Sequence, residues 1–303
     1  ITRDGADVVI KSTLSDEISY VLSGSATEGS LKIYSEEKFE LVMNGVSIVN
    51  SDDPALNIQS GKKATITLVE GTSNRLAWGT QFLSEGGDED VKAAFFIEGQ
   101  LIFSGTGSLV VIGRYRHAIC SDAYIRIDGG NITVALAAKD GIHAKDYIEI
   151  NGGVIDINSM GDGIDSEGYV SLSGGAVKIT TTGEKGHGIK SEAETTVQTS
   201  GNVDIHVQGM ASKAFKCGGD MQVSQGNIYL VTSGDAFYDT EAADISSPAG
   251  IECDGNVTIS NGNITIESSG AGGKGMNADG KIVIGGGEIK VTTTGGQFKY
   301  RND

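Results

Sequence analysis

Acidic and histidine side chains recur at near-constant intervals through the middle of this chain. His117, Asp140, Asp162 and His187 follow one another every 22 to 25 residues, and each is followed by a small residue and an isoleucine. Further carboxylates come shortly after those isoleucines, at Asp122, Asp146 and Asp165. Clustered carboxylates can bind a hard cation such as Ca²⁺, which takes six to eight oxygen ligands. Paired with a histidine, they could also act as the acid and base of a glycoside-cleaving enzyme.

Short strands must position these residues, because apolar side chains around them alternate with a period of two. Residues 139–182 contain two copies of one pattern, and each copy has three such runs, as at Ile142 and Ala144, Ile148 and Ile150, and Ile155 and Ile157. Three short strands in about 23 residues are typical of one rung of a parallel β-helix. The small residue before each rung, such as Gly141 or Gly163, suggests a tight corner with positive φ. The sequence therefore predicts an all-β solenoid.

The repeat predicts one domain over residues 1–303. We expect an N-terminal cap at 1–30, rungs over 31–296 and a C-terminal end at 297–303. The spacing lengthens mainly at the third corner, where function most often varies. We expect one projecting loop after Leu68, containing Trp78 and the acidic residues Glu85, Asp88, Glu89 and Asp90, and another around Asp239.

Stacked rungs lie only about 4.8 Å apart, so the recurring carboxylates should form columns. Like charges at that spacing favour a neutralising cation, and calcium is the ion we expect. Its candidate ligands are Asp122, Asp140, Asp146, Asp162 and Asp165. The alternative is an acidic surface that water solvates, with lysines relieving part of the repulsion.

A second column consists of Tyr124, Tyr147 and Tyr169, which should face outward. Stacked tyrosines can stabilise the solenoid, or they can form a platform for sugar rings. Both interpretations are open on the sequence alone.

The composition excludes some partners. A net charge of −17 makes nucleic acid and anionic membranes poor partners, and no apolar run is long enough to span a membrane. Among the three cysteines, Cys217 and Cys253 should stack inward on neighbouring rungs, as buried thiols or as a disulfide.

Several phrases resemble a family of bacterial surface proteins called carbohydrate-binding domain-containing proteins. They are LVMNGVSI, LVEGTSNRL, LIFSGTGSLVV, HAICSDAYIRIDGG, DGIHAKDYIEINGG and DGIDSEGYVSLSGG. The resemblance implies a right-handed parallel β-helix similar to polysaccharide lyases and calcium held by corner aspartates, which match Asp122, Asp140, Asp146 and Asp162. It also implies non-catalytic binding of a plant cell-wall polysaccharide, cellulose or pectic polygalacturonate, outside the cell or at its surface. We expect the protein to be a monomer. The match weakens after Glu192, which leaves binding by the C-terminal half open.

Two other functions compete with this interpretation. A pectin-active hydrolase or lyase would use Asp140, Asp162 and His187 as acid–base residues, at intervals similar to those of the β-helical polygalacturonases. The Arg-x-Lys motif of those enzymes is missing, and the arginines largely avoid the acidic columns. We therefore favour binding over catalysis. A surface adhesin or structural solenoid is the other alternative.

Overall fold

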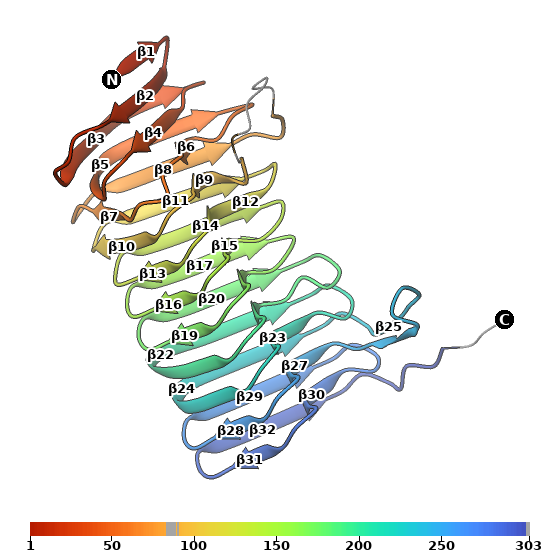
Figure 1. The fold of residues 1–303 in the computed structure, drawn as a ribbon. Coiled ribbons are helices and arrows are strands. Elements are labelled where there is room, and N and C mark those ends of the chain that lie inside the picture. Colours follow the sequence, from red (N-terminus) through yellow and green to blue (C-terminus); the bar gives the residue numbers. More distant parts are fainter. Residues whose placement is uncertain (83–88, 90, 301–303) are drawn as a thin grey trace.

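The structure is a computed structural model, and it describes residues 1–82, 89 and 91–300. Those residues form an all-β solenoid of about 11 turns and contain no helix, so the predicted parallel β-helix is confirmed. Figure 1 shows the turns stacked from the N-terminus to the C-terminus. No described helix is available to cross a membrane. Of the predicted acidic loop, Glu85, Asp88 and Asp90 lie outside the described residues.

One flank of the solenoid is a twelve-stranded sheet, here called sheet A, which carries the first strand of each turn. Its strands pair in parallel except at its N-terminal edge, where β1 is antiparallel to β2. They are β1 (Thr2–Asp4), β2 (Asp7–Ser12), β4 (Leu31–Ser35), β6 (Leu56–Ile58), β9 (Ala93–Ile97), β12 (His117–Ser121), β15 (Ile142–Ala144), β18 (Ile164–Ser166), β21 (Ile189–Ser191), β23 (Lys213–Cys217), β27 (Ala249–Cys253) and β30 (Lys274–Ala278).

The second and third strands of each turn form one eighteen-stranded sheet, here called sheet B. It is continuous because β3, β5, β22 and β24 bend around the second corner and serve as both strands of their turn. Its strands are β3 (Ile18–Thr27), β5 (Phe39–Asn50), β7 (Ala64–Leu68), β8 (Ser73–Trp78), β10 (Leu101–Gly105), β11 (Ser108–Gly113), β13 (Ile125–Ile127), β14 (Asn131–Ala137), β16 (Ile148–Ile150), β17 (Val154–Ser159), β19 (Val170–Leu172), β20 (Ala176–Thr181), β22 (Thr195–Val207), β24 (Met221–Thr232), β28 (Val257–Ile259), β29 (Asn263–Ser268), β31 (Ile282–Ile284) and β32 (Glu288–Thr293).

The core is a set of aliphatic columns that run from turn to turn. Ile119, Ile142, Ile164 and Ile189 face one another in register on neighbouring strands of sheet A, and none is exposed. Each turn thus buries the same kind of side chain against its neighbours, which is why a short repeat suffices to specify the fold. The three cysteines are buried and free, including Cys217 and Cys253, which are register partners on β23 and β27.

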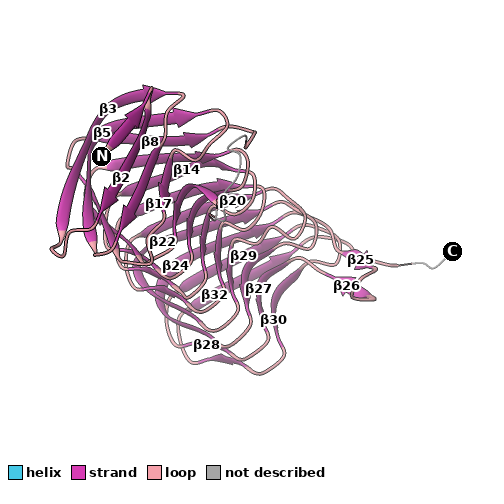
Figure 2. Cartoon of the chain, turned by 45° about the horizontal axis from the view of Figure 1, so that its top comes forward, coloured by secondary structure: helices cyan, strands magenta, loops and turns pink. Residues whose placement is uncertain are grey.

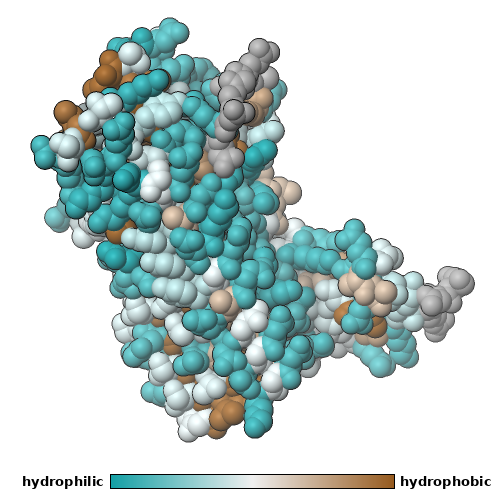
Figure 3. All heavy atoms as spheres, viewed as in Figure 1, coloured by the Kyte–Doolittle hydropathy of each residue, from teal (hydrophilic) through white to brown (hydrophobic). Residues whose placement is uncertain are grey.

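Residues 1–30 close the N-terminal end, but they do so as a turn of the solenoid. β2 pairs in parallel with β4, and β3 pairs in parallel with β5. The predicted cap is therefore already part of the repeat, and only β1 departs from it. Large apolar side chains are exposed near the two ends of the solenoid (Figure 3), where Val21 is 65% exposed and Ile284 57% exposed, and also on its middle turns, where Met160 is 54% exposed.

Two details of the corners differ from expectation. Most glycines with positive φ lie at the second corner, as Gly130 (93°) and Gly153 (84°) do, whereas Gly141 and Gly163, which precede a turn, do not have positive φ. Position 163 requires a glycine for another reason. A Cβ there would overlap Ile179 Cγ2 and lie 2.7 Å from the carbonyl oxygen of Gly188. Close packing between turns, and not positive φ, excludes a larger side chain there.

The third corner contains the large insertions, as predicted, but Trp78 is not in a projecting loop. It ends β8, is completely buried and donates its Nε1–H to the carbonyl of Gln81 at 2.9 Å. Further along, β25 (Phe237–Asp239) and β26 (Asp244–Ser246) form an antiparallel hairpin at the third corner between β24 and β27. This hairpin stands out from the side of the solenoid (Figure 2).

Candidate functional site

The corner residues that precede sheet A hydrogen-bond to the backbone of the next turn. Asp140 Oδ1 accepts from the N–H of Asp162 at 2.8 Å, and Asp162 Oδ1 accepts from the N–H of His187 at 2.6 Å. His187 Nδ1 in turn accepts from the N–H of Lys213 at 3.0 Å. The column predicted from the sequence therefore exists, and one of its functions is to link successive turns.

Burial perturbs the titration of this column. Loss of water, reinforced by the negative charge of Asp140, raises the pKa of Asp162 to about 8, although the hydrogen bond from the His187 N–H opposes this. Burial also lowers the pKa of His187 well below its ordinary value, helped by the positive charge of Lys213. Near neutral pH the His187 ring is therefore uncharged, and Asp162 keeps its proton more tightly than an ordinary carboxyl group does. Asp140, Asp162 and His187, the residues an enzyme would use, thus lie on successive turns.

A second row of polar side chains runs along the outward surface of sheet A. His143 Nδ1 lies 2.9 Å from Asp165 Oδ2, and Lys190 donates to Asp165 Oδ1 at 3.1 Å. Burial disfavours ionisation of Asp165, but these two partners outweigh that cost and hold its pKa at about 2. Asp165 is therefore an ionised carboxylate with two direct neighbours already in place.

Asp122 belongs to a pocket with a volume of about 480 Å³ on the same face. Its carboxylate lies 2.6 Å from Lys92 Nζ and 3.4 Å from Lys145 Nζ. The pocket is lined by Lys92, Arg116, His117, Asp122, Lys139, His143, Lys145 and Glu167. Four cationic side chains thus surround one opening on a chain whose net charge is −17.

The structure brings only some of the five candidate calcium ligands near one another. Asp140 and Asp162 are adjacent in the corner column, whereas Asp122 and Asp165 are engaged by lysine or histidine and Asp146 is exposed. Within the described part of the chain, one group of three metal-ligating side chains has its ligand atoms within 4.8 Å of one another: His117, Asp140 and His143. Two of these three donors are nitrogens, so this group does not fit calcium, which takes oxygen ligands. Calcium binding at Asp140 and Asp162 stays a prediction.

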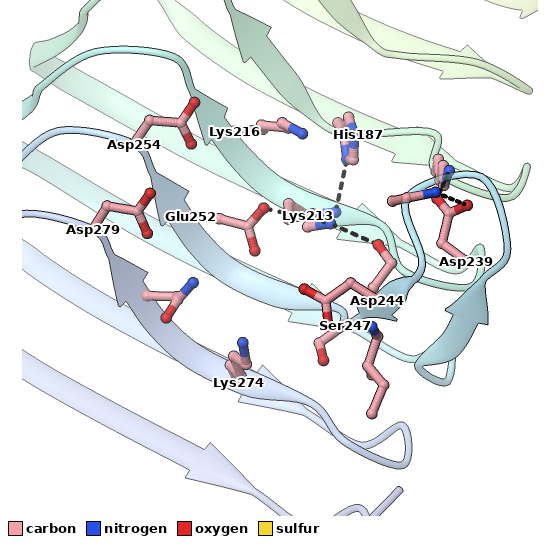
Figure 4. A pocket seen from close by; sticks show the side chains of 15 residues that line it. His187, Lys213, Lys216, Asp239, Asp244, Ser247, Glu252, Asp254, Lys274 and Asp279 are labelled. Carbon is pink, nitrogen blue, oxygen red and sulfur yellow. Dashed lines mark hydrogen bonds and ion pairs between the residues drawn. The ribbon is translucent and has the colours of Figure 1, made fainter. Parts of the chain in front are cut away.

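Sequence reasoning missed a second pocket, about 470 Å³ in volume, between sheet A and the β25–β26 hairpin. Figure 4 shows Asp254, Asp279 and Glu252 on the sheet side and Asp239 and Asp244 on the hairpin side, with Lys213 between them. Lys185 Nζ pairs with Asp239 Oδ2 at 2.5 Å and attaches the hairpin to the third corner two turns before it. The length of the insertion between β24 and β27 indicates from the sequence that something projects there, but it does not show which face of the solenoid the hairpin covers.

Lys213 is the most unusual residue of this second pocket. It is 4% exposed, and the polar partners that its ammonium group has among the described residues are distant, Ser246 Oγ at 3.4 Å and Glu252 Oε1 at 3.5 Å. Burial lowers its pKa despite the nearby Glu252 carboxylate. Lys216, Lys274 and Lys185 line the same pocket, so this site also combines cations with carboxylates.

The predicted tyrosine column forms as a close stack. The Tyr124 and Tyr147 rings are 4.7 Å apart with planes 9° apart, and Tyr147 and Tyr169 are 4.7 Å apart with planes 7° apart. Each internal ring face is therefore covered by the next tyrosine, and the stack presents mainly ring edges to solvent. This geometry favours the stabilising role over a platform of open ring faces.

Comparison with known proteins identifies the family. The profile of the family described as "Carbohydrate-binding domain-containing protein" matches residues 4–297. A protein of that name from Acetivibrio thermocellus is 31% identical over 119 residues, which cover 38% of this chain and 41% of the relative, so the alignment spans about two fifths of that relative's length. A solved structure described as "Structure of the polysaccharide lyase-like protein from C. thermocellum, Gadolinium derivative" superposes with a TM-score of 0.66 at 27% identity, covering 73% of this chain and 89% of that one.

The profile match extends over nearly all turns of the solenoid, including those after Glu192 where the sequence phrases fade. The structural match shows that the similarity includes the stacking of the turns. The chain therefore belongs to the carbohydrate-binding domain-containing family.

Proposed function

We propose that this protein binds an acidic, uronate-rich polysaccharide such as pectic polygalacturonate along the outward face of sheet A, without cleaving it. The observation that carries the proposal is the pair of lysine-rich pockets on that face. The first pocket is lined by four cationic side chains and two carboxylates, a local excess of positive charge on a chain whose net charge is −17, and the second combines four lysines with five carboxylates. A cluster of positively charged side chains on an otherwise acidic protein attracts an anionic ligand.

The two pockets lie on one continuous surface. Between them, the outward side chains of β18 and β21 are Asp165 and Lys190, which pair with each other. Turns are about 4.8 Å apart, so a polysaccharide lying along the solenoid axis could reach both pockets. A pectic ligand is favoured over cellulose because the covered tyrosine faces offer a neutral glucan little stacking surface.

Lysine substitutions within the pockets test this proposal. Lys145 and Lys216 line the two pockets, and replacing either with alanine should weaken retention on polygalacturonate by roughly tenfold, or about 1.4 kcal/mol. Lys178→Ala, on the exposed face of β20 in sheet B, is the matched control for loss of one positive charge. Retention should also fall as sodium chloride is raised. Equal retention of all three variants and the parent would refute the assigned face.

Calcium dependence forms a finer part of the proposal. Asp140 and Asp162 are adjacent, largely buried carboxylates, and a cation would relieve the repulsion that contributes to the raised pKa of Asp162. The structural neighbour is described as a gadolinium derivative, and gadolinium is likewise a hard cation. We propose that calcium binds at this pair and that the protein acts outside the cell or at its surface, where plant cell-wall polysaccharide is met.

Catalysis is a second candidate, favoured by the buried Lys213 and by the raised pKa of Asp162. Groups with perturbed pKa values often mark active sites, although structural networks shift pKa values too. Incubation with polygalacturonate distinguishes the two functions. Under the binding proposal, neither new reducing ends nor the ultraviolet absorbance of an unsaturated product appears. Either signal, if abolished by Asp162→Asn or Lys213→Met, would establish an enzyme.

A further inference from the structure

One buried nitrogen near the first pocket has no hydrogen-bond partner among the residues that the structure describes. His117 is 5% exposed, and its Nδ1 lies 3.1 Å from Asp140 Oδ2, but the two atoms are not aligned for a hydrogen bond. An unsatisfied buried polar atom is costly, so its persistence calls for a physical reason. The other carboxylate oxygen of Asp140 is already used by the Asp162 N–H, which leaves Oδ2 directed at the histidine.

A second histidine adjoins this pair. The His143 ring stacks on that of His117 with centroids 4.9 Å apart and planes 23° apart. One ligand atom from each of His117, Asp140 and His143 lies within 4.8 Å of the others. Behind His143, the Asp165 carboxylate contacts Nδ1, and Lys190 holds that carboxylate in turn. A carboxylate behind a histidine is the arrangement that orients ligands and strengthens their basicity in zinc sites.

We propose that His117, Asp140 and His143 form a binding site for a transition-metal dication of the zinc class, opening into the pocket beside them. Two imidazoles and one carboxylate are typical zinc donors, and a site with three protein ligands keeps a position open for another ligand. Glu167 Oε1, 3.8 Å from His143 Nε2, or a carboxylate of a bound sugar could take that position. This site shares Asp140 with the calcium proposed at Asp140 and Asp162 but differs from it in chemistry, because two of its three donors are nitrogens.

The geometry needs one adjustment. Ligand atoms around a tetrahedral zinc ion, each about 2.1 Å from the metal, are about 3.4 Å apart. The His117–Asp140 pair already has that spacing at 3.1 Å. His143 must turn from its stacked orientation to meet the ion. Its side chain lies on the outward face of β15 and outside the aliphatic core, so this rotation does not disturb the packing between turns.

Lys139 competes with the ion. Its Nζ lies 3.3 Å from His117 Nε2, and a positively charged neighbour opposes the arrival of a dication. If the metal binds at Nδ1, the ring must carry its proton on Nε2, which faces this ammonium group. If it binds at Nε2, it takes the place of the ammonium group. In either case, Lys139 has to move, so removal of its charge should tighten metal binding.

Metal titration of the whole chain, stripped with EDTA and free of glycan, tests the site. Zinc should bind with one-to-one stoichiometry in competition with a chromophoric chelator, and Co²⁺ should give the visible absorption of nitrogen-ligated cobalt. His143→Gln should weaken zinc binding at least 100-fold. Asp165→Asn should weaken it 10- to 100-fold, the range for residues that orient a ligand. Lys139→Met should strengthen it. His206→Gln, which removes a histidine paired with Asp204 on sheet B, should leave it unchanged.

Several outcomes would overturn the proposal. They are zinc affinity that is equal in His143→Gln and the parent, cobalt spectra that show only oxygen ligands, and calcium that displaces cobalt at equal concentration. The cobalt spectrum needs no variant, so misfolding of a variant cannot hide a negative result. Because no polysaccharide is present, failure of the metal site leaves the proposed polysaccharide binding untouched, and the converse also holds.

Discussion

Replacement of Asp162 by asparagine should stabilise the protein at alkaline pH. Burial and the negative charge of Asp140 raise the pKa of Asp162 from an ordinary value of 3.8 to about 8. A carboxyl group whose pKa is higher in the folded state binds its proton more tightly there than in the unfolded chain. The free energy of unfolding must therefore fall as the pH rises from about 4 to about 8, and it should level off above that range.

The pKa difference gives the magnitude. An increase from 3.8 to about 8 corresponds to about 6 kcal/mol, an upper limit for the cost of ionising Asp162 in the fold. Asparagine removes that cost but weakens the hydrogen bond that the carboxylate accepts from the His187 N–H, which is worth about 1.5–3 kcal/mol when charged. The net expectation is a variant about 3–4 kcal/mol more stable at pH 9 and similar to the parent at pH 4.

Urea unfolding in EDTA, followed by circular dichroism from pH 4 to 9, measures this difference. Asp156→Asn, at a half-buried aspartate on β17 of sheet B, is the matched control for replacing one carboxylate with an amide. If the Asp162→Asn and parent curves run parallel over the whole range, Asp162 does not titrate abnormally and the reasoning fails. The same measurement with added calcium tests the proposed calcium site. Calcium should stabilise the parent and should stabilise Asp162→Asn much less.

Three further results are expected. In thermal melts the parent should melt lower in EDTA and recover with calcium, but not with sodium at equal ionic strength; identical melts would exclude calcium. Gly163→Ala should cost about 1–3 kcal/mol because its Cβ meets Ile179 and a backbone carbonyl, whereas Gly61→Ala, with open space around it, should cost little. Tyr147→Ala should lose two ring contacts, about 1–3 kcal/mol of stability, while keeping polygalacturonate retention; loss of cellulose retention alone would instead support a sugar platform.

The fold was predictable because its information is local and repeated. Alternation at Ile142, Ile148 and Ile155 marks three strands, and the recurrence of the pattern at Ile164 places the next turn above it. The strand prediction goes wrong where the alternation of apolar residues is interrupted. Trp78 was assigned to a loop because the segment around it lacks the alternation of the repeat, yet it ends a regular third strand and is fully buried.

The candidate site could be predicted only in part. Equal spacing in the sequence places side chains in columns, but it does not show which atoms those side chains contact. The columns of Asp140, Asp162 and His187 were correctly located, but their hydrogen bonds to the backbone of the next turn depend on side-chain rotamers. The second pocket depends on a hairpin that folds back over sheet A, and its contact between Lys185 and Asp239 spans 54 residues. No period in the sequence encodes such a contact.

The stacked tyrosines give the protein a built-in optical reporter. Three parallel phenol rings at 4.7 Å are close enough for their electronic transitions to couple, so their near-ultraviolet circular dichroism should exceed that of isolated tyrosines. These rings sit on the same three turns as Asp122, Asp146 and Glu167, at the edge of the first pocket's face. Any ligand, ion or substitution that shifts those turns relative to one another should therefore change the signal without an added label.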